Sequence, residues 1–364
     1  MKKYRKIISL GVIALFILLV GIWNNNDFYD LMRWTLRSAV PLMMIALAGL
    51  FSERSGVVNI ALEGIAIFGA FTGLLLLAVL QHNGINGQWI LLLCVIAGGV
   101  AGALFSLLHS FASISMKANQ TISGTALNML AVALAIFLGR ALSYGGTEEI
   151  QFADPFLVEN LGFVSKIPII GDIFFKGFYP IVLFGILVYI IGSIFAYKTR
   201  FGLRMRACGE NPQAADAAGV NVYKIRYVSV TISGFIAGAA GVILIVPTST
   251  SFRASVYGFG FLAMAVLISG QWNPARIIIF SLFFALLRTM SKGKEVMVKI
   301  FSDFSQQTSF LSNVNAGISK FIAKIPNGII EMLPYVFTLV VLALTSKNSQ
   351  GPRAAGEPYD QGKR

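Results

Sequence analysis

The residues best suited to chemistry in this sequence are polar side chains that stand inside long apolar runs. Glu63 is the only carboxylate well inside an apolar run in the first half of the chain, and Asn59 precedes it by about one helical turn. On a helix the two would share a face with the small residues Ala66, Ala70 and Gly73. An ionisable group at membrane depth is costly to bury and is a functional candidate by default.

Two interpretations of this face are open. It could line a polar pathway, or Glu63 could cap a helix break near Gly64 or pair with a neighbouring helix. A second stretch is similar, because Gly124 and Asn128 share a small, partly polar face. Asn128 could contact a substrate or hydrogen-bond to another helix, as Asn often does in membranes. The candidate pathway residues are Asn59, Glu63, Gly124 and Asn128.

The overall composition places these stretches in a membrane. Of 364 residues, 56% are hydrophobic and 12% are charged, with a mean hydropathy of +0.75. A soluble domain carries about 25% charged residues, so a soluble chain this apolar would be unable to cover its surface. The net charge of +13 therefore fits basic residues that flank membrane spans and meet lipid, rather than nucleic-acid binding.

Ten apolar runs approach the length of about 20 residues that a helix needs to cross a bilayer. They cover 7–23, 35–51, 57–80, 88–112, 119–142, 178–197, 226–248, 257–270, 272–290 and 328–345. The eighth run is short, and only Gln271-Trp272-Asn273-Pro274 separates it from the ninth. The two runs could therefore form one broken element, which would make nine spans instead of ten. We interpret the first as a retained span rather than a signal peptide, because no small-residue cleavage site follows it.

The expected fold is therefore all-α and polytopic, and Lys and Arg residues set its orientation. With the N-terminus in the cytoplasm, the basic loop 198–225 and the C-terminus are also cytoplasmic, whereas the acidic loop 143–177 is outside. The segment 291–327 is expected outside although it carries five lysines. We expect one transmembrane domain over 1–346 and a flexible cytoplasmic tail over 347–364.

A short helix is predicted inside the basic loop. Asn211 and Pro212 suit a helix start, because Asn caps the first turn and Pro fits it, and Gly219 suits the end. The helix over 212–218 is either part of a solvated loop or a docking element for a partner. In the following span, Gly234 and Gly238 form a GxxxG pattern that favours close helix packing.

Motifs for energy coupling and metal binding are missing from the sequence. No GxxxxGK[ST] phosphate loop occurs, so any ATP that drives this protein is hydrolysed by another chain. The two cysteines and two histidines have no metal-ligand spacing, and no disulfide is expected. We therefore expect this chain to bind no cofactor and no metal.

Four stretches in order resemble one family of membrane proteins. The loop GENPQAADAAGVNVYKIR resembles the segment where the ATPase docks on permeases of bacterial ABC importers for ribose-type sugars, branched-chain amino acids and nucleosides. ERSGVVNIALEG, NQTISGTALNML and GFGFLAMAVLISGQWNP resemble the nucleoside branch, and within it the shorter of two permeases that work side by side. The resemblance covers about residues 31–345, and both 7–23 and 291–327 depart from it.

The resemblance implies a permease subunit of an ABC-type importer that forms the pathway for nucleosides in the bacterial plasma membrane. Its implied partners are an ATP-binding subunit, a second permease subunit and an extracytoplasmic substrate-binding lipoprotein. The residues implied to couple the ATPase to the pathway are Gly209, Glu210, Asn211, Pro212, Ala215, Asp216, Gly219 and Val220.

Other functions fit the residues less well. A permease for a simple sugar such as ribose is the nearest alternative, because no residue reads a base or a ribose on physical grounds. An ion-coupled secondary transporter is more distant, since it needs buried acids or discontinuous helices, and the spans offer only Glu63 and Glu331. An intramembrane enzyme would need a Ser/His pair or paired Asp residues within the predicted spans, and they contain neither.

Overall fold

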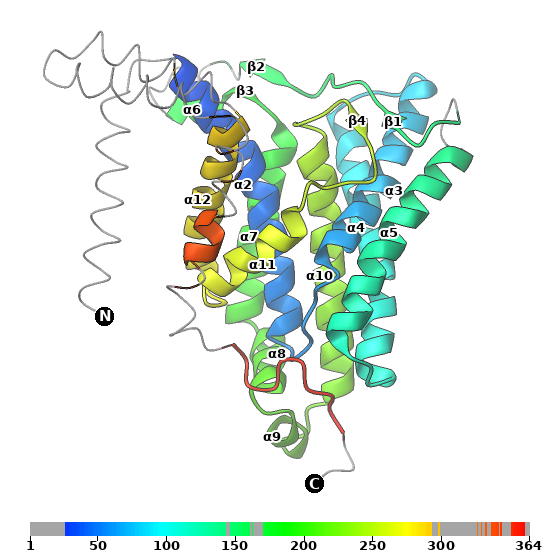
Figure 1. The fold of residues 1–364 in the computed structure, drawn as a ribbon, viewed down its shortest axis with the longest axis vertical. Coiled ribbons are helices and arrows are strands. Elements are labelled where there is room, and N and C mark those ends of the chain that lie inside the picture. Colours follow the sequence, from blue (N-terminus) through cyan, green and yellow to red (C-terminus); the bar gives the residue numbers. More distant parts are fainter. Residues whose placement is uncertain are drawn as a thin grey trace, which may run out of the picture.

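The computed structural model describes residues 26–142, 146–160, 162, 170–292 and 351–360, with isolated residues and short stretches between 298 and 343. Seven helices in this part of the chain are long and apolar enough to cross a membrane. They are α2 (Asn26–Glu53), α3 (Leu62–His82), α4 (Gln88–Ser110), α5 (Gln120–Leu142), α7 (Pro180–Lys198), α10 (Val222–Ile245) and α12 (Pro274–Lys292). This confirms the prediction of an all-α polytopic membrane protein (Figure 1).

The short eighth run is a helix of its own. It forms α11 (Phe259–Ser269), whose 11 residues span about 17 Å, roughly half of a bilayer core. A turn in which Gln271 and Trp272 have φ near +50° separates α11 from α12. The predicted spans 7–23 and 328–345, and nearly all of 291–327, lie outside the continuously described residues.

Three helices cross closely at glycines. A Cβ on Gly238 of α10 would lie 2.4 Å from the carbonyl oxygen of Gly98 on α4, and a Cβ on Gly69 of α3 would lie 2.3 Å from the Cα of Gly238. Small residues allow membrane helices to approach backbone to backbone in this way. The GxxxG pattern of α10 therefore lies at the centre of the helix packing.

The segment between α2 and α3 is the main departure from the predicted helices. Residues 54–61, which we call the unwound segment, are non-helical although the prediction extended a helix from 57. Gly56 has a φ of +97°, which L side chains rarely adopt, and this turns the chain out of α2. Asn59 lies in this segment, before α3 begins, so the predicted helical face from Asn59 to Gly73 starts only at Leu62.

The two ends of the helix bundle carry different structures (Figure 1). At one end, the loop 143–177 contributes short elements: β1 (Ile150–Gln151), β2 (Val158–Asn160), α6 (Ile170–Phe174) and, at its edge, β3 (Lys176–Phe178). Strand β1 pairs with β4 (Ser251–Phe252) and β2 pairs with β3, both antiparallel. At the other end lie α8 (Arg200–Glu210) and α9 (Pro212–Ala217). The π-helix η1 (Phe111–Ser115) continues α4 toward this second end.

Candidate functional site

The unwound segment is buried, so its backbone needs hydrogen-bond partners from the protein itself. Gln120 of α5 accepts a hydrogen bond from the Val58 N–H at 2.7 Å. The Nε2 atom of His109 on α4 lies 3.0 Å from the Val58 carbonyl oxygen. Asn128 of α5 donates to the Ile60 carbonyl oxygen at 3.0 Å. Side chains from two neighbouring helices thus replace the hydrogen bonds that a continuous helix would make.

Asn128 also completes the start of α3. Residue Ala61, at the N-cap of α3, provides no side-chain cap. The Oδ1 atom of Asn128 instead accepts the Gly64 N–H at 2.7 Å, which satisfies one of the unpaired amides of the first helical turn. Gly124, one turn earlier on α5, leaves room for this contact, since a Cβ there would lie 3.1 Å from the Ala61 nitrogen.

Glu63 performs the corresponding role for α11. Its two carboxylate oxygens accept the N–H groups of Gly258 at 2.8 Å and of Gly260 at 2.6 Å, and the residue is only 7% exposed. A carboxylate is favourable at the amino end of a helix, where unpaired N–H groups and the helix dipole are both positive. Glu63 therefore joins the start of α3 to the start of α11.

The structure brings the four candidate pathway residues together around one feature. Asn59 lies in the unwound segment, where it accepts the Ala61 N–H at 3.1 Å and donates to the Ser233 hydroxyl at 3.4 Å. Asn128 and Gly124 contact this segment or the first turn of α3, and Glu63 lies in that first turn and bonds to the start of α11. Each of the three polar side chains is engaged with protein groups, and a role in the transport pathway stays a prediction.

Several residues of this network were not identified from the sequence. Besides Gln120 and His109, the buried Glu53 accepts a hydrogen bond from the Trp272 indole at 2.6 Å, which ties the end of α2 to the turn after α11. The signal in the sequence that could have identified these residues is that they are polar and lie within or beside apolar runs. Their partners are not visible in sequence because they are up to 219 positions apart.

Arg226 links the unwound segment to the C-terminus. Its side chain is 1% exposed and donates to the carbonyl oxygens of Ser55 at 3.1 Å and Glu357 at 3.0 Å. Residues 351–360, which we call the C-terminal strap, also donate from Gly356 to Gly56 at 3.1 Å. The sequence predicts a flexible tail over 347–364, whereas this part of it packs against the helix bundle.

The predicted docking helix is present as α9. Asn211 caps it by accepting the Ala214 N–H at 3.0 Å, and Pro212 occupies the first turn. Gly219, with a φ of +82°, ends it, and the Val220 N–H returns to the Ala215 carbonyl oxygen at 3.0 Å. This is the expected glycine-terminated helix end.

Helix α8 was not predicted, because its sequence was interpreted as a basic loop. Thr199 caps it by accepting the Gly202 N–H, and its buried face includes Met205 and Cys208. Burial raises the pKa of the Cys208 thiol to about 11, so this group stays neutral and serves in packing. The amphipathic pattern was obscured by the basic residues of its exposed face.

The predicted coupling residues lie at the junction of α8, α9 and the unwound segment. A Cβ on Gly209 would lie 2.3 Å from the Arg54 carbonyl oxygen, and Glu210 pairs with the Arg54 guanidinium at 3.2 Å. On α9, Pro212 and Ala215 are buried while Gly219 is exposed. The end of α8, which leads into α9, therefore contacts the start of the unwound segment directly.

Comparisons with known proteins identify the family of this chain. Residues 32–306 match the family described as branched-chain amino acid transport system / permease component. The chain belongs to this family. Its members are permease components, which are membrane subunits of a transport system.

Individual relatives cover nearly the whole chain. The guanosine ABC transporter permease protein NupQ of Bacillus subtilis is 39% identical over 91% of this chain and 96% of its own length. The nucleoside ABC transporter permease protein NupC of Lactococcus lactis is 37% identical over 89% of this chain and 95% of its own length. The putative glucose ABC transporter permease protein TsgC13 of Haloferax volcanii is 30% identical over 89% of this chain and 94% of its own length. No solved structure matches the chain.

Removal of the Asn128 amide tests the structural part of this site. Asn128→Leu keeps the approximate volume but leaves the Ile60 carbonyl and the Gly64 N–H without this partner, at a cost of about 1–3 kcal/mol for each buried group. We expect a lower melting temperature in detergent and less folded protein. Thr125→Val is the matched control, since the exposed Thr125 hydroxyl contacts only carbonyl groups of its own helix. Equal melting temperatures for the two variants would contradict this account.

Proposed function

We propose that this chain is the permease subunit of an ABC-type importer for nucleosides. The observation that carries the substrate class is the near full-length similarity to two permeases whose names specify guanosine and nucleosides. The conformation of α9 supports an ABC mechanism, because a short, capped helix projects from one end of the bundle (Figure 1). ATP is then hydrolysed by a separate subunit that binds at α9.

The proposed orientation puts α8, α9 and the C-terminal strap in the cytoplasm. These elements lie at the same end of the bundle, opposite to the short strands (Figure 1). The loop 198–225 is basic and the loop 143–177 is acidic, as expected for cytoplasmic and external segments. A second permease subunit and an extracytoplasmic substrate-binding lipoprotein complete the proposed importer.

Coupling is proposed to run from α9 to the unwound segment. Glu210 and Gly209, at the end of α8, contact Arg54, where the unwound segment begins. From there, Glu63 connects the start of α3 to the start of α11. In transporters, interrupted helices of this kind often surround the substrate site, so a displacement at α9 would reach the region where substrate passes.

The alternative functions have weaker support. A simple-sugar permease is favoured by the relative whose name specifies glucose, at 30% identity. An ion-coupled transporter would need a carboxylate available to a cation, and both oxygens of Glu63 accept backbone N–H groups. The ABC importer of nucleosides therefore remains the better supported function.

Uptake of radiolabelled guanosine tests the proposed substrate class. We expect cells that carry the gene to accumulate guanosine faster than cells that lack it, and excess ribose or glucose to leave this uptake unchanged. Gene-dependent uptake of ribose or glucose without guanosine would move the substrate to sugars. An adenosine competitor measures selectivity within the nucleosides.

A glycine substitution tests the coupling role of α9. Gly219→Val forces a β-branched residue into a left-handed conformation at the end of α9, and we expect ATP hydrolysis to continue while uptake per ATP falls several-fold. Gly84→Val is the matched control, because Gly84 has a similar φ of +77°, equally open surroundings and a place in the loop between α3 and α4. The measurement is uptake and ATP hydrolysis in proteoliposomes that contain the complete importer. The same loss of coupling in both variants would refute a special role for α9.

A further inference from the structure

A cavity of about 350 Å³ lies between α2, α10, α11 and α12. Small-molecule pockets in proteins usually measure about 300–1,000 Å³, so this one is large enough for a ligand. Its aromatic and cationic lining residues are Trp34, Arg37, Tyr257, Phe259 and Arg288, with Thr248 and Thr289 among the polar ones. None of the four pathway residues predicted from sequence lines it.

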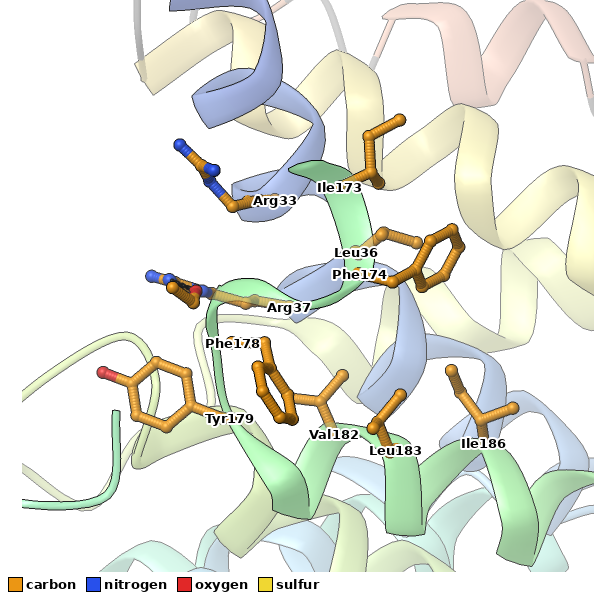
Figure 2. Close-up of a pocket in the computed structure, with 11 residues that line it drawn as sticks. Arg33, Leu36, Arg37, Ile173, Phe174, Phe178, Tyr179, Val182, Leu183 and Ile186 are labelled. Atoms are coloured by element: carbon orange, nitrogen blue, oxygen red, sulfur yellow. Dashed lines mark hydrogen bonds between the residues drawn. The ribbon is translucent and has the colours of Figure 1, made fainter. Parts of the chain in front are cut away.

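A neighbouring cavity provides a contrast. It measures about 30 Å³, close to the volume of one water molecule, and shares Arg37 with the larger one. Figure 2 shows this smaller cavity, with Arg37 and Tyr179 on one side and apolar side chains such as Phe174 and Leu183 on the other. Only the larger cavity can hold a nutrient molecule.

We propose that the larger cavity binds the transported nucleoside and selects bases that carry an oxo group, as guanine and hypoxanthine do. This rests on the proposed function. Flat aromatic side chains stack on bases, and Trp34, Tyr257 and Phe259 supply three of them. Threonine hydroxyls can both donate to and accept from the hydroxyls of a ribose.

The two guanidinium groups carry the selectivity. Arginine only donates hydrogen bonds, and it pairs well with the O6 and N7 acceptors of guanine. Adenine carries an amino group at the same edge. That group is also a donor, so it cannot accept a hydrogen bond from arginine. The Arg37 side chain is held by a hydrogen bond to the Gly177 carbonyl oxygen at 2.6 Å and lies over the Tyr179 ring at 4.9 Å. Its Nε is buried and has no hydrogen-bond partner in the protein.

The wall formed by the start of α11 is held rigidly. Arg288 donates to the Tyr257 carbonyl oxygen at 2.7 Å and lies 4.4 Å from the centre of the Phe259 ring. Glu63 holds the N–H groups on both sides of Phe259. Glu63 is thus a positioning residue for the cavity, which connects the unwound segment to the proposed substrate site.

Uptake kinetics of labelled guanosine, inosine and adenosine test this site in cells with the complete importer. We expect Trp34→Ala to raise the KM for all three nucleosides about tenfold through lost stacking. Arg37→Gln should weaken guanosine and inosine uptake more than adenosine uptake. Trp89→Ala is the control, because Trp89 is 83% exposed at the start of α4 and lies away from the cavity. Protein levels in the membrane are measured for every variant.

The outcomes separate the two proposals. If the unmodified protein carries guanosine and Trp34→Ala keeps the original KM, the cavity assignment is wrong while the function stands. If the unmodified protein carries no nucleoside, the proposed function fails and the cavity proposal fails with it. Trp34 is 42% exposed, so its truncation is tolerable for folding even if Arg37→Gln reduces protein levels.

A separate set of contacts assigns a role to the C-terminal strap. We infer that it joins the docking end of the protein to the unwound segment. The Ala354 N–H donates to the Gly209 carbonyl oxygen at 2.9 Å, at the end of α8. Gly356 and Glu357 reach the unwound segment directly and through Arg226. Ala354 and Tyr359 are each only 4% exposed, so the strap is part of the packed structure.

Two truncations test the strap. A chain ending at residue 350 lacks it, and a chain ending at residue 360 keeps it as the control. We expect the shorter chain to insert in the membrane and to transport several-fold less guanosine per ATP in proteoliposomes of the complete importer. A purely structural strap would lower the melting temperature and leave the transport per ATP unchanged, and that result would overturn the inference.

Discussion

Buried backbone groups that no helix satisfies are the constraint on which this structure depends. In a membrane, an unpaired N–H or C=O group has no water to bond, so each interruption of a helix needs a partner supplied by the protein. Among the residues that the structure describes, such interruptions lie within the bundle at residues 54–61 and before α11. Asn128 of α5 caps α3, and Glu63 of α3 caps α11. Each cap comes from another helix, so the three helices hold each other in register.

The same interruptions are points where several parts of the bundle meet. Arg226 and the C-terminal strap reach the unwound segment from one side, and the end of α8 contacts it through Arg54. A continuous helix would pass a displacement along its own axis, whereas a break held by side chains passes it to several helices. The glycine crossings of α3, α4 and α10 provide close packing beside these interruptions.

The larger cavity and the polar network differ in what their side chains contact. Asn59, Asn128 and Glu63 bond to the protein itself, which suits groups that hold a conformation. The cavity instead gathers aromatic rings and guanidinium groups around an open volume, which suits a ligand with a flat base. Their common element is the start of α11, because Glu63 binds the turn that places Tyr257 and Phe259.

The sequence by itself determined the membrane class, the approximate positions of the seven long helices among the described residues, and the cap residues of α9. These follow from local composition and spacing, in which the apolar length of a run or an Asn-Pro start needs no distant partner. Only the tertiary structure decided that the break between the predicted spans 35–51 and 57–80 extends to residue 61, which groups bond to Glu63 and Asn128, and how the strap packs. Those features depend on groups far apart in the chain, such as Glu63 with Gly260, or Arg226 with Glu357. Residues 57–61 are predicted as helix because four of the five, all but Asn59, are apolar, and folding alone brings the side chains that satisfy their backbone.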